Sequence, residues 1–440
     1  MNFDQMRDLL LEQAFQGHLV PQLKEEPTIE PDSKVSGDVA FEIPQKWKWA
    51  TLDDCVVFNP KIQSDDDADV SFIPMQACEA GYVSKLDVTD VRKWKTVKKG
   101  FSKFQDQDVL MAKITPCFQN RKSAIAENLK GGIGAGTTEF HVLRCNKNLL
   151  PKYLLFFLKS SYLIRYGVGH FKGTAGQQRI GKSELKNCAV PIPSLNEQRR
   201  IVAKLEESFA EIDRAEKAYR ELQTLTSVLR GKILQEAVMG KLVPQLDDEP
   251  AVEQIGEVPE DVPFEIPEKW KWGVLSSIVP NVVDCPHSTP KYCDSETEYL
   301  AIDTNCIDDF GKITKWRYVT EEIYRARITR LTIQADDVIY TREGSIGRAA
   351  RVPVDVKVCM GQRVMLIRPG EWIDSSFLQI YLMSKGTLSL LTEKQRGIGV
   401  KHINVSDVKK LPVPIPPLEE QRRIVAKVEE LMVQVDRLAT

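Results

Sequence analysis

A run of basic residues interleaved with aromatic ones is the part of this sequence best suited to contact a polyanion. The segment VRKWKTVKKGFSKF covers residues 91–104. Its basic members are Arg92, Lys93, Lys95, Lys98, Lys99 and Lys103. Neutralisation of phosphates supplies most of the affinity for nucleic acid, and large aromatic side chains can anchor such a segment to its domain. We predict DNA-phosphate contacts here, with a solvated basic surface as the open alternative.

Two glycine-bearing loops carry side chains that can read base edges. The first, GTAGQQRIGK, covers residues 173–182, and the second, QRGIGVKHIN, covers 395–404 at an equivalent place. Gln, Arg, Lys and His are donor types that hydrogen-bond to bases in the major groove. We therefore predict DNA contacts for Gln177, Gln178, Arg179, Arg396, Lys401 and His402. A mobile turn before the last strand of each domain is the alternative.

Basic residues are unevenly distributed along the chain. Although the formal net charge is −2, residues 41–190 hold 23 Lys and Arg against 15 Asp and Glu, a net of +8. Residues 264–413 hold 21 against 19, a net of +2. In this second segment we predict DNA contacts for Lys315, Arg317 and Arg342, with Arg325, Arg327 and Arg330 as further candidates. Charge sorted by segment thus favours a DNA partner that the total alone argues against.

Catalytic motifs are missing from the sequence. There is no Gly-x4-Gly-Lys-Ser/Thr phosphate loop, and the Asp/Asn-Pro-Pro-Tyr/Phe tetrapeptide of amino-methyltransferases is approached only by FNPK at 58–61. Cys285, His287, Cys293 and Cys306 lie close in sequence but match no common zinc spacing. We predict a non-catalytic chain without a metal site. Its nine cysteines are expected to be reduced thiols.

Composition predicts a cytoplasmic protein of two or three domains. The 440 residues exceed one ordinary core, and 42% hydrophobic with 28% charged residues is typical of a globular chain. The first residues, MNFDQMRDLLLEQ, lack the basic and apolar regions of a secretory signal. No apolar run approaches the ~20 residues that cross a bilayer, so no membrane partner is expected.

Much of the sequence is duplicated at an offset of 223 positions. EQRRIVAK occurs at 197–204 and again at 420–427, each time after Val-Pro-Ile-Pro, and FEIPQKWKW at 41–49 matches FEIPEKWKW at 264–272. Between these blocks, short β-branched runs such as QDVLMAKI (107–114) and DDVIYTRE (336–343) predict strands. LLPKYLLFFLKSSYL (149–163) predicts a mostly buried helix. The period is that of repeated domains.

A long helix is predicted from Asn196 to about Gly240. Apolar residues recur there in steps of three and four, which is typical of a helix packed on a partner helix, and Ser194 can cap its start. The second copy is split between 418–440 and 1–17, so we expect these segments to stack end to end and lie antiparallel to the first. Residues 24–40 and 247–263, acidic and rich in proline, are expected to be solvated connectors.

The predicted fold class is α+β, with two globular α/β domains separated by a pair of long antiparallel helices. The helices would form a coiled-coil spacer in a pseudo-twofold circular arrangement. The predicted boundaries are 1–23 for an N-terminal helix that completes the second spacer helix, 24–193 for the first globular domain, 194–246 for the central helix region, 247–416 for the second globular domain, and 417–440 for the C-terminal helix region.

These features resemble the specificity subunit of type I restriction-modification enzymes. The resemblance is carried by Pro44 with Trp47, Pro267 with Trp270, the two Val-Pro-Ile-Pro blocks followed by Glu-Gln-Arg-Arg-Ile-Val, and Thr138-Glu139-Phe140. DCPHSTP at 284–290 is similar to a segment often seen early in such domains and is absent from the first globule. The resemblance covers the whole chain.

The resemblance implies that the two globular domains are target-recognition domains, and that each reads one half of a bipartite site in double-stranded DNA. It also implies docking of two methyltransferase subunits, to which restriction (translocase-nuclease) subunits can add, with S-adenosylmethionine and Mg/ATP bound by those partners and no cofactor by this chain. The residues expected to dock the partners are Glu197, Gln198, Arg199, Arg200, Glu420, Gln421, Arg422 and Arg423. The alternatives are a self-contained DNA-modifying enzyme and a repeat-built scaffold without a DNA role.

Overall fold

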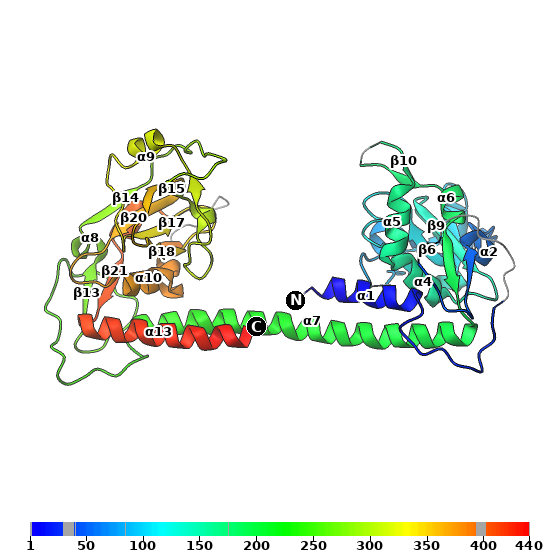
Figure 1. The fold of residues 1–440 in the computed structure, drawn as a ribbon, viewed down its shortest axis with the longest axis horizontal. Coiled ribbons are helices and arrows are strands. Elements are labelled where there is room, and N and C mark those ends of the chain that lie inside the picture. Colours follow the sequence, from blue (N-terminus) through cyan, green and yellow to red (C-terminus); the bar gives the residue numbers. More distant parts are fainter. Residues whose placement is uncertain are drawn as a thin grey trace. The chain divides into compact units, whose positions relative to one another are not determined.

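The computed structural model describes residues 2–29, 39, 41–83, 85–174, 176–392 and 402–439. The chain forms two compact units, Met1–Ala218 (unit 1) and Tyr219–Thr440 (unit 2), each built of helices and strands (Figure 1). The boundary falls inside the long helix α7 (Leu195–Val238), which begins in unit 1 and ends in unit 2. Within the described residues, no helix combines the length and apolar character needed to span a bilayer.

Unit 1 begins with a helix, continues through a mixed domain and ends in the first half of α7. Its elements before α7 are α1 (Phe3–Phe15), β1 (Lys48–Thr51), α2 (Leu52–Cys55), β2 (Val56–Phe58), β3 (Asp69–Ile73), η1 (Met75–Ala77), β4 (Val91–Lys93), α3 (Trp94–Val97), β5 (Ser102–Gln105), β6 (Val109–Ala112), β7 (Ser123–Ile125), η2 (Lys130–Gly132), β8 (Ile133–Gly136), β9 (Phe140–Cys145), α4 (Pro151–Lys159), α5 (Ser161–Gly169), β10 (Phe171–Lys172), β11 (Arg179–Ile180), α6 (Lys182–Lys186) and β12 (Ala189–Ile192).

Unit 2 repeats this order, from the second half of α7 to a C-terminal helix. Its further elements are β13 (Lys271–Val274), α8 (Leu275–Ile278), β14 (Asn281–Asp284), β15 (Tyr299–Ile302), η3 (Thr304–Cys306), β16 (Arg317–Tyr318), α9 (Glu321–Arg327), β17 (Val338–Thr341), β18 (Ala349–Arg351), β19 (Lys357–Met360), β20 (Val364–Arg368), α10 (Ser375–Met383), α11 (Lys385–Thr392), α12 (Val405–Lys409), β21 (Pro412–Ile415) and α13 (Leu418–Ala439).

The main sheets of the two units have corresponding strand orders. An antiparallel sheet ordered β2-β9-β6-β7 in unit 1 corresponds to β14-β20-β17-β18 in unit 2. A second sheet, β4-β3-β8-β5, corresponds to β16-β15-β19, and its central pair is parallel in both units. The strands predicted at 107–114 and 336–343 are confirmed as β6 and β17. Unit 1 has one additional strand in its second sheet, β5, which belongs to the basic segment.

Buried ion pairs stand at matching places in the first sheet of each unit. Arg144 pairs with Asp108 at 2.7 Å, and Arg368 pairs with Asp337 at 2.7 Å; both carboxylates are 1% exposed. In each case the guanidinium contacts both carboxylate oxygens. Breaking a buried pair of this kind strongly destabilises a fold, so these pairs fix the same strand pairing in both units.

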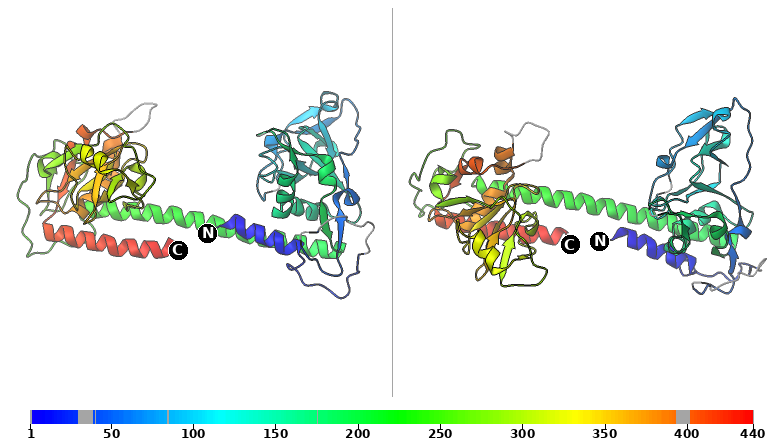
Figure 2. Two further views of the ribbon diagram at one scale, coloured as in Figure 1. Left: turned by 45° about the horizontal axis from the view of Figure 1, so that its top comes forward. Right: turned by 90° about the horizontal axis from the view of Figure 1, so that it is seen from above.

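Each unit contains a pair of helices beneath its sheets. In unit 1, α1 lies alongside the first half of α7 in every view (Figure 2), and Arg7 contacts Asp213 at 2.6 Å and Glu216 at 2.7 Å. In unit 2, α13 lies alongside the second half of α7, and Arg230 pairs with Asp436. Arg7 and Arg230, like Asp213 and Asp436, are 223 positions apart, so the duplication extends to helix contacts.

The duplicated blocks form the junction between each domain and the helix that precedes it. Gly17 and Gly240 end α1 and α7 with positive φ angles of 77° and 70°. A Cβ atom at either glycine would lie 2.3–2.4 Å from the ring of Pro44 or Pro267, so only glycine fits. The strands β1 and β13, which begin with the second Lys-Trp of each Lys-Trp-Lys-Trp block, then pair with β12 and β21, which contain Val-Pro-Ile. The repeated letters therefore encode a repeated junction between helix and domain.

Three expectations about individual segments need correction. The helix expected at 149–163 is two helices, because Ser160 is extended and its side chain caps α5 by accepting from the Leu163 amide at 3.2 Å. The apolar stripe of α7 is not buried throughout, since Leu225 is 65% exposed. The connectors are not simply solvated where they begin: Lys46 donates to the Leu23, Lys24 and Glu26 carbonyls, and Lys269 does the same at Leu246, Asp247 and Glu249.

Candidate functional site

The basic segment of unit 1 is anchored by its aromatic residues, as predicted. Trp94 and Phe104 are buried, and Phe101 packs edge-on against Phe72 with ring centroids 5.0 Å apart. Trp94 lies in a small core of its own with Val70 and other apolar residues of β3, α3 and β8. These contacts fix the backbone of β4 and α3 while Lys95 and its neighbours face solvent.

The same segment is paired with carboxylates of its own unit. Lys93, Lys95 and Lys98, here called the lysine trio, contact Asp69, Asp67 and Asp66, here called the acidic trio, at distances of 2.9, 2.8 and 2.7 Å. The hydrogen bond between Lys93 and Asp69 raises the pKa of the lysine and lowers the pKa of the carboxyl group. Local neutralisation on this face is a feature that the count of basic residues did not predict.

The remaining basic residues of the segment differ in their surroundings. Arg92 pairs with Asp90 at 2.7 Å, and its guanidinium carbon lies 3.5 Å from the centroid of the Phe72 ring. Lys99 is exposed and Lys103 is half-buried on β5, and neither has a recorded ion pair among the described residues. All six predicted residues thus lie on one continuous stretch of β4, α3 and β5.

The first predicted loop returns to the end of strand β6. Arg179 forms a β-bridge with Ile114, and its guanidinium makes two hydrogen bonds to Glu139, at 2.9 and 3.0 Å. This contact raises the pKa of Arg179 and lowers that of Glu139. Gln177 is exposed and Gln178 is half-buried. The three predicted residues therefore lie together, and Glu139 joins them as a partner that the motif search did not assign to the site.

The matching place in unit 2 holds different chemistry. A bridge between Glu343 and His402 stands where Ile114 and Arg179 meet in unit 1. Beside it, Arg342 binds both oxygens of Asp284 at 2.6 Å, and the His402 ring contacts Asn404 at 3.1 Å. Arg363 lies nearby with its Nε 3.7 Å from Glu343. Arg396 and Lys401, also predicted to contact DNA, lie outside the described residues.

The sequence-level search missed Asp284, Arg363 and Lys113. Lys113 precedes Ile114 as Arg342 precedes Glu343, so the alignment of QDVLMAKI with DDVIYTRE already matched the two basic residues. Asp284 belongs to the DCPHSTP segment, whose letters gave no indication of its ionic partner. The sites are comparable in position but carry an Arg–Glu pair in one unit and an Arg–Asp pair with a histidine in the other.

The other basic candidates of unit 2 fall into two groups. Lys315 is exposed, and Arg317 lies with its guanidinium carbon 5.3 Å from the centre of the Tyr292 ring. Arg327 is buried and donates to the carbonyls of Ser288, Met360 and Gly361, so it holds the domain together and is not available to DNA. Its candidacy for DNA binding is therefore corrected to a structural role.

The duplicated Glu-Gln-Arg-Arg block also needs a partial correction. Glu197, Gln198, Glu420 and Gln421 are at most 1% exposed, so a partner cannot reach them in this fold. Gln198 bridges α7 to the segment before α4, accepting from the Leu150 amide and donating to the Asn148 and Pro193 carbonyls. Gln421 makes the equivalent contacts to Asp374, Trp372 and Pro416. Burial raises the pKa of both glutamates.

The arginines of the block divide in the same way in both units. Arg200 binds Glu26 and the Pro21 carbonyl, and Arg423 binds Glu249 and the Pro244 carbonyl, so each fastens a connector to its helix. Within the described residues, Arg199 and Arg422 make their side-chain contacts to Asn196 and Glu419 of their own helices. Arg422 is 61% exposed. Of the predicted docking residues, these two are exposed.

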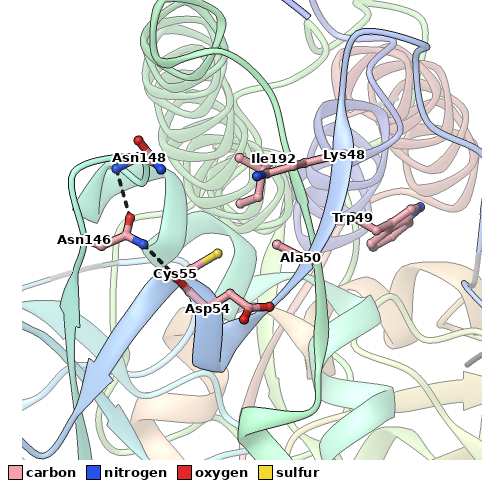
Figure 3. A pocket seen from close by; sticks show the side chains of 8 residues that line it. All are labelled: Lys48, Trp49, Ala50, Asp54, Cys55, Asn146, Asn148 and Ile192. Carbon is pink, nitrogen blue, oxygen red and sulfur yellow. Dashed lines mark hydrogen bonds between the residues drawn. The ribbon is translucent and has the colours of Figure 1, made fainter. Parts of the chain in front are cut away.

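A small pocket lies at the junction of β1, β12 and the loop after β9 (Figure 3). Its lining residues are Lys48, Trp49, Ala50, Asp54, Cys55, Asn146, Asn148 and Ile192. The Asn146 side chain donates to the Asp54 carbonyl and accepts from the Asn148 amide, so its polar atoms are satisfied within the fold. In the part of the chain that the structure describes, no group of three metal-ligating side chains that could hold an ion occurs.

Comparison with known proteins shows which proteins share this organisation. A family model described as the type I restriction modification DNA specificity domain matches residues 44–223 and 302–436. The EcoAI specificity subunit of Escherichia coli is 29% identical over 98% of this chain and 89% of its own length. The EcoEI specificity subunit of the same organism is 27% identical over the same shares.

Solved structures share the fold. A chain from a study of assembly and conformational transition in the type I restriction-modification system superposes with a TM-score of 0.67, at 20% identity, over 89% of this chain and 92% of that one. The HsdS subunit from Thermoanaerobacter tengcongensis gives 0.57 at 20% identity, over 91% and 92%.

Proposed function

This chain belongs to the type I restriction-modification DNA specificity family, and from that premise we propose that its two units each read one half of a bipartite DNA site. A specificity subunit is a non-catalytic member of its complex. The proposal goes further: it assigns base reading to the site around the Ile114–Arg179 bridge after β6 in unit 1 and to the site around the Glu343–His402 bridge after β17 in unit 2. The basic segment of unit 1 supplies phosphate contacts.

The proposal rests on one observation: the two units share a fold but carry different side chains at the equivalent site. The sheets, the buried ion pairs and the helix junctions match between units, whereas the site residues do not. Unit 1 offers Gln177 and Arg179 beside Glu139; unit 2 offers Arg342 and His402 beside Asp284. Different donors and acceptors select different bases, so a chain built this way suits a site whose halves differ in sequence.

We further propose that α7, with α1 and α13, forms a coiled-coil spacer with pseudo-twofold symmetry. At ~1.5 Å per residue, the 44 residues of α7 measure about 66 Å. Half-sites read from one side of a duplex are separated by about one turn, ~34 Å, or multiples of it. A continuous helix is stiff enough to hold two readers at one such separation.

The proposal includes two methyltransferase partners, one for each copy of the helix junction. Arg199 and Arg422 are the equivalent exposed residues from which such docking surfaces would extend. The partners would bind S-adenosylmethionine, and translocase-nuclease partners would use Mg/ATP, in the cytoplasm where the DNA lies. Support for two like docking sites comes from the duplication, which repeats the junction contact by contact.

Selection from a random duplex library tests the proposed function. The full-length chain, alone and with co-purified partners, is expected to enrich two short conserved elements separated by a constant number of arbitrary base pairs. Arg179→Ala should relax one element and Arg342→Ala the other, by about tenfold in affinity, since a good base contact contributes ~1–3 kcal/mol. Enrichment of a single uninterrupted element, or of none, would contradict the proposal.

A further inference from the structure

We propose that the acidic trio is a built-in competitor of DNA phosphate, which restrains the lysine trio from binding DNA of arbitrary sequence. The inference rests on the proposed function and identifies how one of its contact surfaces is regulated. A basic face that binds every duplex equally well would hold a specificity protein on the wrong DNA. Three carboxylates of the same unit, one for each lysine, lower this binding to DNA of arbitrary sequence.

The acidic trio is fixed in place by backbone contacts that do not depend on charge. The amide of Trp94 donates to the Ala68 carbonyl and the amide of Lys95 to the Asp66 carbonyl, both at 2.9 Å. In the register of β3 and β4, Asp69 stands directly opposite Lys93. The burial of Trp94 beneath these strands holds the two segments together. The carboxylates are therefore presented to the lysines by the fold itself.

The ion pairs are nevertheless exchangeable. The lysine side chains are 38–55% exposed and the carboxylates 45–75% exposed, so water and salt reach both partners. Exposed pairs of this kind are weak and screened by ions. A DNA phosphate that approaches can displace a carboxylate, because binding also releases counterions from the duplex. A phosphate must displace a carboxylate at each lysine of the trio, and this reduces the net free energy gained when DNA binds.

This competition acts differently on specific and arbitrary DNA. On a correct site, base contacts made by Gln177 and Arg179 hold the duplex in place, and displacement of the carboxylates follows at a high local phosphate concentration. On arbitrary DNA no base contact supports the displacement. The acidic trio therefore widens the ratio between specific and non-specific affinity without touching a base.

The test compares charge removal at the acidic trio with equal charge removal elsewhere. The variant Asp66→Asn, Asp67→Asn, Asp69→Asn keeps the side-chain shape and the backbone contacts. Its control, Glu42→Gln, Glu79→Gln, Glu127→Gln, changes the net charge equally at three exposed residues of unit 1 that have no recorded ion pair among the described residues. Affinity of the full-length chain is measured at several salt concentrations for an arbitrary duplex and for the duplex selected from the library.

We expect the Asp→Asn variant to bind the arbitrary duplex about five- to tenfold more tightly than the control variant at low salt. The gain on the selected duplex should be smaller, so that specificity falls. Adding Lys93→Gln, Lys95→Gln and Lys98→Gln should cancel the gain, because it is transmitted through those lysines.

Three results would overturn the inference. The first is equal affinity of the Asp→Asn and control variants for arbitrary DNA, and the second is a gain that persists without the lysines. In either case, retained binding of the selected duplex by the unmodified chain shows that the proposed function still stands. The third is failure of the unmodified chain to bind any duplex, which removes the proposed function together with the inference. Circular dichroism of each variant checks that the fold is intact.

Discussion

Two buried glutamines, Gln198 and Gln421, join the long helices to the domains above them. Each side chain accepts one amide and donates to two carbonyls, and each is fully buried. Buried amides satisfied in this way are costly to remove, because the groups left behind lose their partners as well. These contacts explain why the sequence repeats Glu-Gln in the first turn of α7 and of α13: the repeat preserves the hydrogen bonds between helix and domain.

Replacement of either glutamine by alanine should destabilise the unit that contains it. We expect the free energy of unfolding of that unit to fall by about 2–4 kcal/mol, since several buried polar groups lose hydrogen bonds. Urea denaturation, with the transitions of the two units analysed separately, provides the measurement.

The neighbouring exposed arginines serve as controls for this prediction. Arg199→Ala and Arg422→Ala should change unfolding by less than about 0.5 kcal/mol. If the glutamine variants unfold like these controls, the hydrogen bonds between helix and domain do not contribute as argued.

Residue types alone could not distinguish a buried contact between helix and domain from an exposed docking site. The block Glu-Gln-Arg-Arg is strongly polar, which favours an exposed docking site, and only the structure shows that three of its four positions point inward or onto a connector. For the basic segment, the local sequence predicted the buried residues but not the ionic partners of the exposed ones. Its letters predicted the aromatic anchors, but the carboxylates that face its lysines lie more than twenty positions earlier in the chain, and no local pattern relates the two.

At the scale of elements, an arginine ties the helix pair of each unit together. Arg7 is 9% exposed and contacts Asp4, Asp213 and Glu216, and its guanidinium also lies over the Tyr82 ring. Arg230 occupies the equivalent position with Asp436 and lies over Phe310. Both helix pairs are thus also tied to a domain loop through an aromatic ring.

Loss of Arg7 should therefore loosen α1. In Arg7→Met we expect amide hydrogen exchange in α1 to accelerate by about ten- to a hundredfold, which corresponds to ~1–3 kcal/mol of local stability. Arg230→Met should have a smaller effect on α13, because Arg230 binds Asp436, which is 51% exposed, whereas Arg7 also binds Glu216, which is only 21% exposed.

Arg214→Met is the matched control for both variants, since Arg214 lies on the exposed face of α7. Exchange in α1 that is unchanged in Arg7→Met, or changed equally in Arg214→Met, would show that the ion pairs do not hold the helix.

Periodicity predicted these elements well where one face is buried. The long helix was expected from Asn196 to about Gly240 and runs from Leu195 to Val238, with Ser194 as its cap. The strands at 107–114 and 336–343 are also confirmed. The single helix expected at 149–163 was wrong, because an apolar run on both sides of Ser160 conceals a capped break. A continuous pattern does not indicate where the backbone turns.

At the scale of the whole molecule, the duplication predicted two units and the structure contains two. The matching sheets and the differing sites support two readers of different sequences. The closed arrangement of helices stays a prediction, as does the separation that it would impose. The proposed separation of the half-sites depends on α7, which begins in unit 1 and ends in unit 2.

Insertion into α7 tests this most directly. Seven helix-forming residues placed after Gln223 lengthen the helix by about two turns, or ~10.5 Å. The library selection should then return the same two elements with a spacer about three base pairs longer, at 3.4 Å per base pair. Seven residues inserted between Glu260 and Asp261, in the connector of unit 2, should leave the spacer as it was. An unchanged spacer in the α7 variant, or an equal change in the connector variant, would contradict the claim that α7 sets the distance between the half-sites.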